Sequence, residues 1–410
     1  MSMTIQRKRA IVRTVEPVLL AAKLCDRLVR YVPSHLTGRP KVVLPLPAAT
    51  KGGRRPFRRE PRRILVIRLD SIGDVLLSEP AIGALRKRHP KATIDAAVGR
   101  LGRAILDGNP AIDSLILYDA PWHAVWRGSK VNWVQEFGKL MRTVRVLRRR
   151  RYDLAVELRG DFRDIVFALL SGASAVIGCG WRGGHTLLDY DVPFDTQVHQ
   201  VAFALAIASG AGADPSPRPP FLAIEERERA RAAALLQGLD ATLIGIHLGA
   251  GFPSKCLPLD KFVAVANAIC DRWASPYGPR PAFVVVGGND ERDIAEQFRR
   301  LVSGRSINLA GRLSLKGTAA VLAQCRLFIG NDSGPMHLAA AMGTPVVTFF
   351  GPSEPFRFHP YGVPYKLLEV DLPCRPCDFV HCAQGDHRCL SSLKEERIIQ
   401  AAEQLLAEHL

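Results

Sequence analysis

The stretch from Leu327 to Pro352 holds residue types that can bind a phosphate group and a sugar. Its sequence, LFIGNDSGPMHLAAAMGTPVVTFFGP, predicts a strand, a tight turn, a short helix over 336–342 and a second strand. The first turn of such a helix carries unpaired backbone N–H groups at the positive end of the helix dipole, where phosphate binds readily. Asp332, Ser333 and His337 would surround that phosphate. The plainer alternative is that Asp332 or Ser333 only caps the helix and that His337 is an ordinary surface histidine.

Three further residues could complete a site for a nucleotide. The loop GAGFPSKCLPLDKF contains a single Lys255 after a predicted strand, and a positioned cation of this type neutralises a diphosphate. Glu291 begins a helix after the strand FVVVGG, where a carboxylate can accept from ribose hydroxyls or simply favour the helix dipole. The turn DSIGD ends in Asp74, which could act as a general base or cap its helix. A solvated loop lysine remains the plain alternative for Lys255.

Strand and helix patterns alternate along two long stretches of the chain, which predicts an α/β fold with parallel sheets. The first stretch covers 64–215 and the second covers 225–410, with a hinge rich in Gly and Pro between them. We expect two doubly wound, Rossmann-like domains that face a central cleft, because ligands bind at the carboxyl ends of parallel strands. Neither G-x-G-x-x-G nor the Walker A loop occurs at these turns, which disfavours NAD enzymes and P-loop NTPases.

The strong positive charge of the chain belongs to its first 63 residues. Of the net charge of +17, residues 1–63 contribute +13, from 16 Lys and Arg against 3 Asp and Glu, so the remainder is near +4. The charge therefore gives no support for nucleic-acid binding. Apolar residues at helical spacing alternate with basic ones over 11–32, which predicts a basic amphipathic helix. This helix would either adhere to an anionic membrane surface or pack on the body of the protein.

Several features predict a protein on the cytoplasmic side of the membrane. The chain has no run of about 18 uninterrupted apolar residues. Glu16, Lys23 and Asp26 interrupt the apolar part of the N-terminus, which makes a poor signal peptide. Nine unevenly spread cysteines make a weak disulfide framework.

Four of the cysteines form a group near the end of the chain, in the segment CRPCDFVHCAQGDHRC. The C-x2-C spacing followed by two more cysteines suits a tetrahedral zinc or iron site. Its ligands would be Cys374, Cys377, Cys382 and Cys389. The alternative is a reduced, cysteine-rich loop without a metal.

An ordered set of segments resembles glycosyltransferase family 9, the heptosyltransferases that build the lipopolysaccharide inner core with a GT-B fold. The segments are RLDSIGDVLLSEPAIGALR, YDLAVELRGDFR, IHLGAGFPSKCLPLDKF, VVGGNDE and FIGNDSGPMHLAAAMGTPVVTFFGPS. The resemblance covers roughly residues 64–400 and leaves the basic extension of 1–63 outside it.

The resemblance implies a role for each matching residue. Asp74 would be the base that deprotonates the acceptor hydroxyl, and Lys255 would neutralise the nucleotide diphosphate. Glu291 would grip the donor ribose. The residues that would hold the donor sugar and phosphates are Asp332, Ser333, Gly334 and His337. The residues on the acceptor side, where anionic sugar acids would be held, are Arg68, Arg159 and Arg163.

The expected reaction is an inverting transfer of heptose from ADP-heptose to a lipopolysaccharide core-type acceptor. No metal would be required for catalysis, because Lys255, His337 and the helix N-terminus at Ser333 would stabilise the leaving diphosphate. Zinc or iron at the cysteines would be structural. The expected partners are a nucleotide-sugar donor, an anionic glycan or glycolipid acceptor and, through 1–63, the anionic inner face of the cell membrane. The alternatives are a transferase or epimerase that uses another nucleotide sugar, and a non-catalytic nucleotide-sugar-binding protein at the membrane.

Overall fold

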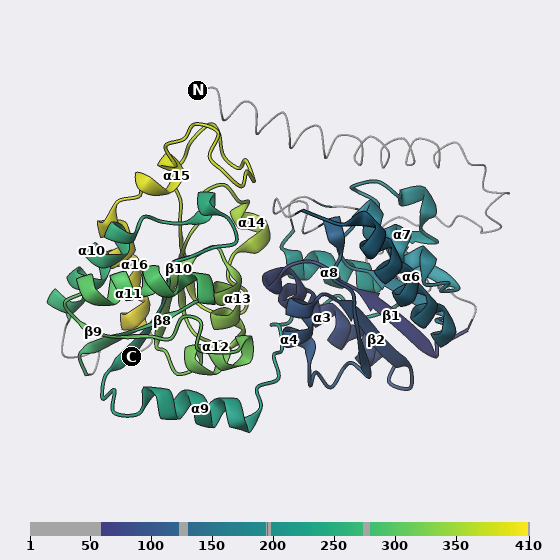
Figure 1. Ribbon diagram of the computed structural model, residues 1–410, viewed down its shortest axis with the longest axis horizontal. Coiled ribbons are helices and arrows are strands. Elements are labelled where there is room, and N and C mark those ends of the chain that lie inside the picture. Colours follow the sequence, from purple (N-terminus) through teal and green to yellow (C-terminus); the bar gives the residue numbers. More distant parts are fainter. Residues whose placement is uncertain (1–58, 123–129, 194, 196–197, 274–278, 409–410) are drawn as a thin grey trace. The chain divides into compact units, whose positions relative to one another are not determined.

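The computed structural model describes residues 59–122, 130–193, 195, 198–273 and 279–408. The chain divides into two compact units (Figure 1). The first unit contains the chain up to residue 196 together with 200–217, and the second contains 197–199 and 218–410. The basic extension and its predicted helix over 11–32 lie outside the described residues.

The first unit is built on a six-stranded sheet in the order β3-β2-β1-β4-β5-β6, and all of its strand pairs are parallel. Its two central strands, β1 (Arg63–Ile67) and β4 (Leu154–Glu157), are almost completely buried, as expected for a parallel sheet covered on both faces. The other strands are β2 (Thr93–Val98), β3 (Ser114–Leu117), β5 (Ala175–Gly178) and β6 (Tyr190–Asp191). The helices are α3 (Ile72–Arg88), α4 (Arg100–Leu106), α6 (Trp133–Arg150), α7 (Phe162–Leu170) and α8 (Gln200–Ser209).

The second unit repeats this architecture, with a parallel sheet in the order β12-β11-β10-β7-β8-β9. The strands are β7 (Thr242–His247), β8 (Pro281–Val286), β9 (Arg305–Asn308), β10 (Leu327–Asn331), β11 (Val346–Phe349) and β12 (Tyr365–Leu368). The helices are α9 (Glu226–Leu236), α10 (Leu259–Asp271), α11 (Arg292–Leu301), α12 (Leu315–Leu322), α13 (Gly334–Ala341), α14 (Pro355–Phe358), α15 (Arg388–Ser391) and α16 (Glu395–Glu408).

Both sheets follow the doubly wound strand order, so each has one point where the chain direction across the sheet reverses. That point lies between β1 and β4 in the first unit and between β7 and β10 in the second. Ligands bind beyond the carboxyl ends of the strands at such a switch point. The predicted α/β class with two doubly wound sheets is confirmed.

Two helices begin earlier than the sequence predicts, and both differences affect the candidate residues. Helix α3 begins at Ile72, so Asp74 lies inside its first turn instead of ahead of it. Helix α13 begins at Gly334, with Ser333 in the extended N-cap position. The cause in α13 is Pro335, which fits the first turn of a helix because no backbone N–H is needed there.

Candidate active site

In the first unit, the carboxylate of Asp74 is held by two side chains from the loop that follows β1. The Arg68 guanidinium donates from Nη2 to Asp74 Oδ1 at 3.1 Å, and the Ser71 hydroxyl donates to Oδ2. Arg68 is buried, with 2% of its side chain exposed, whereas Asp74 keeps 25% exposure. Both carboxylate oxygens of Asp74 are therefore held by hydrogen bonds from Arg68 and Ser71. The carboxylate nevertheless stays exposed enough to meet a substrate.

The same arginine connects Asp74 to a second, buried carboxylate. Arg68 Nε lies 2.8 Å from Asp70 Oδ1, and Asp70 Oδ2 lies 3.3 Å from Arg159 Nε, which comes from the loop after β4. Burial raises the pKa of Asp70, with Arg68 opposing and Asp74 adding to the rise. The loops that follow β1 and β4 are thus joined by a chain of ion pairs in which aspartate and arginine side chains alternate.

Arg159 is the centre of a further group of carboxylates around the start of α7. Its Nη1 lies 3.8 Å from Asp161 Oδ2 and 3.7 Å from Asp164 Oδ2. Burial raises the pKa of Asp164 to about 7, although Arg159 opposes the shift. Burial would also raise the pKa of Asp161, but hydrogen bonds from Arg163 and the charge of Arg159 lower it to about 2. The neighbouring Glu157 is fully buried, and its pKa is raised well above the usual value by burial and by Asp164.

The structure therefore brings together the three arginines named for the acceptor side, but it turns them toward carboxylates of the protein. Arg68 donates to Leu158 O in addition to facing Asp70 and Asp74. Arg159 is 15% exposed and Arg163 is 35% exposed. Arg68 positions Asp74 in this arrangement, whereas Arg163 has the most exposed side chain of the three and donates to both carboxylate oxygens of Asp161. Acceptor binding by the three residues stays a prediction.

In the second unit, Lys255 and Asp332 form an ion pair across the switch point. Lys255 Nζ lies 2.6 Å from Asp332 Oδ2, with exposed side-chain fractions of 20% and 6%. Lys255 ends a short 3-10 turn (Pro253–Lys255) after β7, and Asp332 follows β10 directly. Ser353, which follows β11, donates from its hydroxyl to the same Asp332 oxygen. A partly exposed cation is thus fixed at the carboxyl ends of the central strands.

A buried histidine links two of the other candidate residues. His247, the last residue of β7, places Nδ1 2.9 Å from Ser333 Oγ and Nε2 3.2 Å from Glu291 Oε2. Glu291 Oε2 also accepts from Gly288 N at 2.6 Å. Burial would raise the pKa of Glu291, but the hydrogen bond and charge of His247 and the Gly288 amide lower it. A Cβ at Gly249 would collide with the Glu291 carboxylate, so any larger residue there would displace this carboxylate from its bonds to His247 and Gly288.

The start of α13 is arranged differently from an ordinary capped helix. Ser333 occupies the N-cap position, yet its side chain makes no capping hydrogen bond, because the hydroxyl faces His247 and donates to Asn331 O. The first-turn N–H groups of α13 are therefore not covered by the Ser333 side chain. His337 lies one turn into the helix and is buried, with 6% exposure, so it is no surface histidine.

Asn331 fixes the loop after β7 against the end of β10. Its side chain accepts from Leu257 N at 2.9 Å and donates to Leu248 O at 2.9 Å. These hydrogen bonds hold the segment that carries Lys255 beside Asp332. They can form because β7 and β10 are neighbouring parallel strands, which places the residues after both strands at the same edge of the sheet.

The four clustered cysteines are all free thiols, and Cys374 is exposed. Burial raises the pKa of Cys389, Arg375 opposes the rise, and the charges of Cys382, Cys377 and Cys374 add to it. Within the described part of the chain, however, no three His, Cys, Asp or Glu side chains converge in a geometry that holds a metal ion. The metal site stays a prediction.

Several residues of these two clusters are not singled out by sequence reasoning. They are Ser71, Glu157, Asp161, Asp164, His247, Asn331 and Ser353. A usable signal exists for His247 and Glu157, since each is the polar last residue of a largely apolar strand. Asp164 gives a weaker signal, because a carboxylate in the first turn of a helix usually only complements the dipole.

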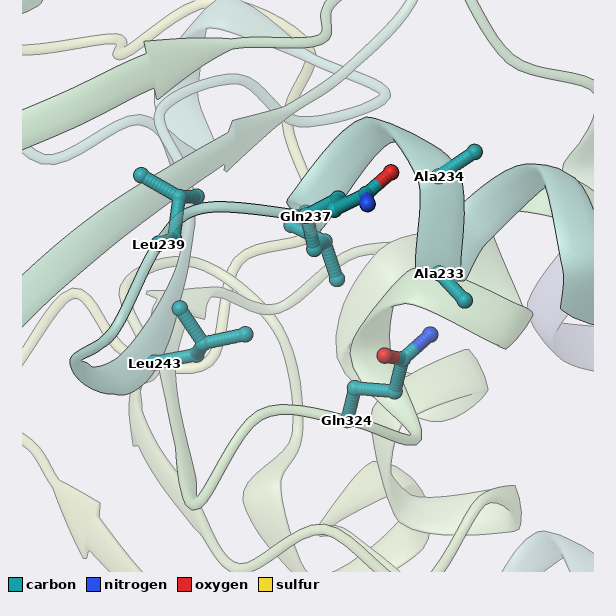
Figure 2. Close-up of a pocket in the computed structure, with 7 residues that line it drawn as sticks. Ala233, Ala234, Gln237, Leu239, Leu243 and Gln324 are labelled. Carbon is teal, nitrogen blue, oxygen red and sulfur yellow. The ribbon is translucent and has the colours of Figure 1, made fainter.

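A cavity elsewhere in the second unit is not a candidate for the chemistry. It has a volume of about 460 Å³ and lies beside α9, with Ala233, Leu239, Leu243 and Gln324 in its lining (Figure 2). Leu243 is at the amino end of β7, the end opposite to Lys255 and His247. The lining has alkyl and amide groups and no charged side chain.

We also find no helix in the described residues with the length and apolar character needed to cross a membrane.

The doubly wound sheets and the charged groups at their switch points define a two-domain α/β protein of the GT-B class. Two solved structures share this fold. The glycosyl transferase family 9 protein from Veillonella parvula superposes with a TM-score of 0.69 at 24% identity, covering 85% of this chain and 97% of that one. The Escherichia coli ADP-heptose lps heptosyltransferase II superposes with a TM-score of 0.66 at 24% identity, covering 84% and 99%.

Sequence comparison identifies the family. Residues 140–386 match glycosyltransferase family 9 (heptosyltransferase), and the chain belongs to this family. It is similar to lipooligosaccharide heptosyltransferase 2 of Haemophilus ducreyi, with 27% identity over 366 residues, 84% of this chain and 99% of that protein. It is also similar to lipopolysaccharide heptosyltransferase 2 of Salmonella typhimurium, with 25% identity over 363 residues, 84% and 99%. The protein is therefore a glycosyltransferase, as the segment pattern predicts.

Proposed function

We propose that this glycosyltransferase moves a heptose from ADP-heptose to a lipopolysaccharide core-type acceptor with inversion. The observation that carries the proposal is the Lys255–Asp332 pair at the start of α13. A partly exposed ammonium group beside a helix N-terminus favours an anion such as a diphosphate. The heptosyltransferases among the relatives support heptose as the sugar and lipopolysaccharide as the acceptor.

The second unit would bind the donor through these groups. The diphosphate would lie against Lys255 and the N–H groups of Gly334 and its neighbours, with His337 as a further donor. Glu291 would accept from the ribose hydroxyls, because its lowered pKa keeps it ionised and the His247 bond fixes its direction. Groups held in place before the reaction stabilise the charge that develops on the leaving diphosphate. In this proposal, catalysis requires no metal ion.

The first unit would activate the acceptor. An acceptor hydroxyl attacks the anomeric carbon of the donor sugar, its proton passes to Asp74, and the bond to the diphosphate breaks so that ADP leaves. Arg68 and Ser71 orient the Asp74 carboxylate and keep it exposed for this step. Arg163 would bind an anionic group of the acceptor, since its side chain is the most exposed of the three arginines.

We further propose that the protein works at the inner face of the cell membrane, with the basic residues 1–63 contributing to adhesion. The net charge of +13 in this segment supports attraction to anionic lipids. For the cysteines, four neighbouring thiols are the donor set that zinc or iron takes, and a metal there would be structural. The reaction does not depend on it.

Replacing Asp74 with Asn tests the role of the base. We expect transfer to fall by about 10²–10⁴-fold, since that is the usual contribution of a general base, while calorimetric ADP binding is retained. Asp260→Asn is the matched control, because Asp260 is an exposed carboxylate in the first turn of α10. Transfer by Asp74→Asn at the level of the control would refute the role of Asp74 as the base.

A panel of ADP- and UDP-sugars, read by mass spectrometry of the acceptor, tests the identity of the donor and the alternative of a non-catalytic protein.

A further inference from the structure

The cysteine-rich stretch of the second unit contains residues 375–380, which we call the bridging segment because they bond to two separate loops. The segment begins at Arg375, whose side chain is only 8% exposed. Its guanidinium donates to Gly351 O, to Val370 O at 2.7 Å and to the Glu369 carboxylate at 3.1 Å. A buried guanidinium needs acceptors within the protein. These bonds therefore attach the start of the bridging segment to the chain that follows β11 and β12.

The middle of the bridging segment bonds to the loop after β11. The main-chain N–H groups of Cys377 and Asp378 both donate to Pro352 O, at 2.9 Å and 3.0 Å. The next residue is Ser353, whose hydroxyl donates to Oδ2 of Asp332. The bridging segment thus holds the main chain from which Ser353 reaches the Asp332 carboxylate.

The end of the bridging segment bonds to the loop after β7. The Ser254 hydroxyl donates to Phe379 O, and the Ser254 N–H donates to Val380 O at 3.3 Å. Ser254 is buried, with 2% exposure, so water has little access to these bonds. It directly precedes Lys255, which pairs with the same oxygen of Asp332. Two loops that meet at one carboxylate oxygen are therefore joined a second time, through the bridging segment.

Both loops need such support, because they follow the strands and are rich in small and turn-forming residues. Their sequences are GAGFPSK after β7 and GPS after β11. A lysine is a point charge on a flexible side chain, and a binding site is effective when its groups are held in place by a second layer of contacts. We propose that the bridging segment positions Lys255 and its partner Asp332 for the donor diphosphate, with Arg375 as the positioning residue that anchors it. This inference rests on the proposed donor site.

The positioning does not use the cysteine side chains. The bonds to Gly351, Pro352 and Ser254 come from the Arg375 guanidinium and from main-chain groups. A Cys377→Ser change keeps the main-chain N–H that bonds to Pro352. The bridging segment should therefore act in the same way with or without a metal at the thiols.

Calorimetric titration of the full-length protein with ADP tests the role of Arg375. We expect Arg375→Gln to weaken ADP binding by on the order of tenfold, less than the loss of the Lys255 ammonium group itself. The matched control is Lys261→Gln. Lys261 is similarly buried, at 13% exposure, and donates to Leu393 O and the Glu395 carboxylate, so its variant should bind ADP as the parent does. Equal ADP affinities of these two variants would overturn the proposal.

A second variant tests the other end of the bridging segment and keeps the proposal open to refutation if Arg375→Gln does not fold. Ser254→Ala removes only the hydroxyl bond to Phe379 O and should weaken ADP binding by about threefold. Its control is Ser303→Ala, which removes an exposed hydroxyl bond to Asn267 and should leave ADP binding unchanged. ADP binding by Ser254→Ala at the level of this control would count against the proposal.

A double-mutant cycle separates positioning from a general loss of structure. If Arg375 acts through Lys255, then adding Arg375→Gln to Lys255→Ala should weaken ADP binding by less than about threefold further. The same tenfold loss in both backgrounds would show that Arg375 acts independently of Lys255 and would overturn the proposal. Normal ADP binding by Lys255→Ala alone would contradict the proposed donor site and, with it, this inference, so the two failures can be told apart.

Discussion

Replacing Asp164 with Asn should remove part of the pH dependence of the stability of the first unit. Asp164 is fully buried in α7, and its pKa is raised from 3.8 to about 7. Between about pH 4 and pH 7, the folded protein keeps a proton that the unfolded chain has already released. The free energy of unfolding therefore falls as the pH rises through this window, which is the opposite of the usual effect of a paired aspartate.

The size of the effect follows from the two pKa values. A carboxyl group with these values contributes about 2 kcal/mol less to the free energy of unfolding at pH 7 than at pH 5. An asparagine has no proton to lose, so Asp164→Asn should remove this slope. Relative to the wild type, the variant should gain about 2 kcal/mol between pH 5 and pH 7.

Urea unfolding at a series of pH values measures the difference. The two units need not unfold together, so a signal from the first unit alone is required. Trp273 is the one tryptophan of the sequence that belongs to the second unit, and in a Trp273→Phe background the remaining four report on the first. Ile165→Val, a buried change in the same helix, is the control and should cost about 1 kcal/mol at every pH. A difference between Asp164→Asn and the wild type that does not change with pH would refute the assignment.

Two further predictions concern the second unit. Lys255→Ala should weaken ADP binding by about 10–100-fold in calorimetry, because a charge-assisted contact with the diphosphate is lost. The control is Lys366→Ala, which removes a lysine from an exposed ion pair with Glu408 and should bind ADP normally. Equal affinities of the two variants would exclude Lys255 from the donor site. If the four cysteines bind a structural metal, elemental analysis of the purified protein should find zinc or iron. This metal should be lost when Cys377 and Cys382 are replaced with Ser, while Asp74-dependent transfer persists. Metal-free protein of full stability would exclude the site.

Much of the fold could be predicted because buried parallel strands have a distinct pattern. The apolar runs of β1, β7, β8 and β10 are each followed by turn residues and a helix, and the structure contains each of these strands. The same pattern locates Asp74, Lys255 and Asp332 after central strands, since the residue that follows a strand lies at its carboxyl end whatever the rest of the fold does. Helix starts were predicted less well. Helix α3 begins directly after the extended Ser71, and α13 includes Pro335 in its first turn, so both helices start inside the stretches whose Gly, Ser and Pro residues indicate a turn.

The sequence by itself thus determined which elements form and which polar residues lie at the ends of the strands. Only the tertiary structure decided how those residues are paired. Lys255 and Asp332 are 77 positions apart, and the His247 bonds to Glu291 and Ser333 span 44 and 86 positions. Such contacts depend on which strands are neighbours and in what register, and on how deeply each group is buried. Burial likewise turned Arg68 inward, because a charge removed from water must find partners within the protein.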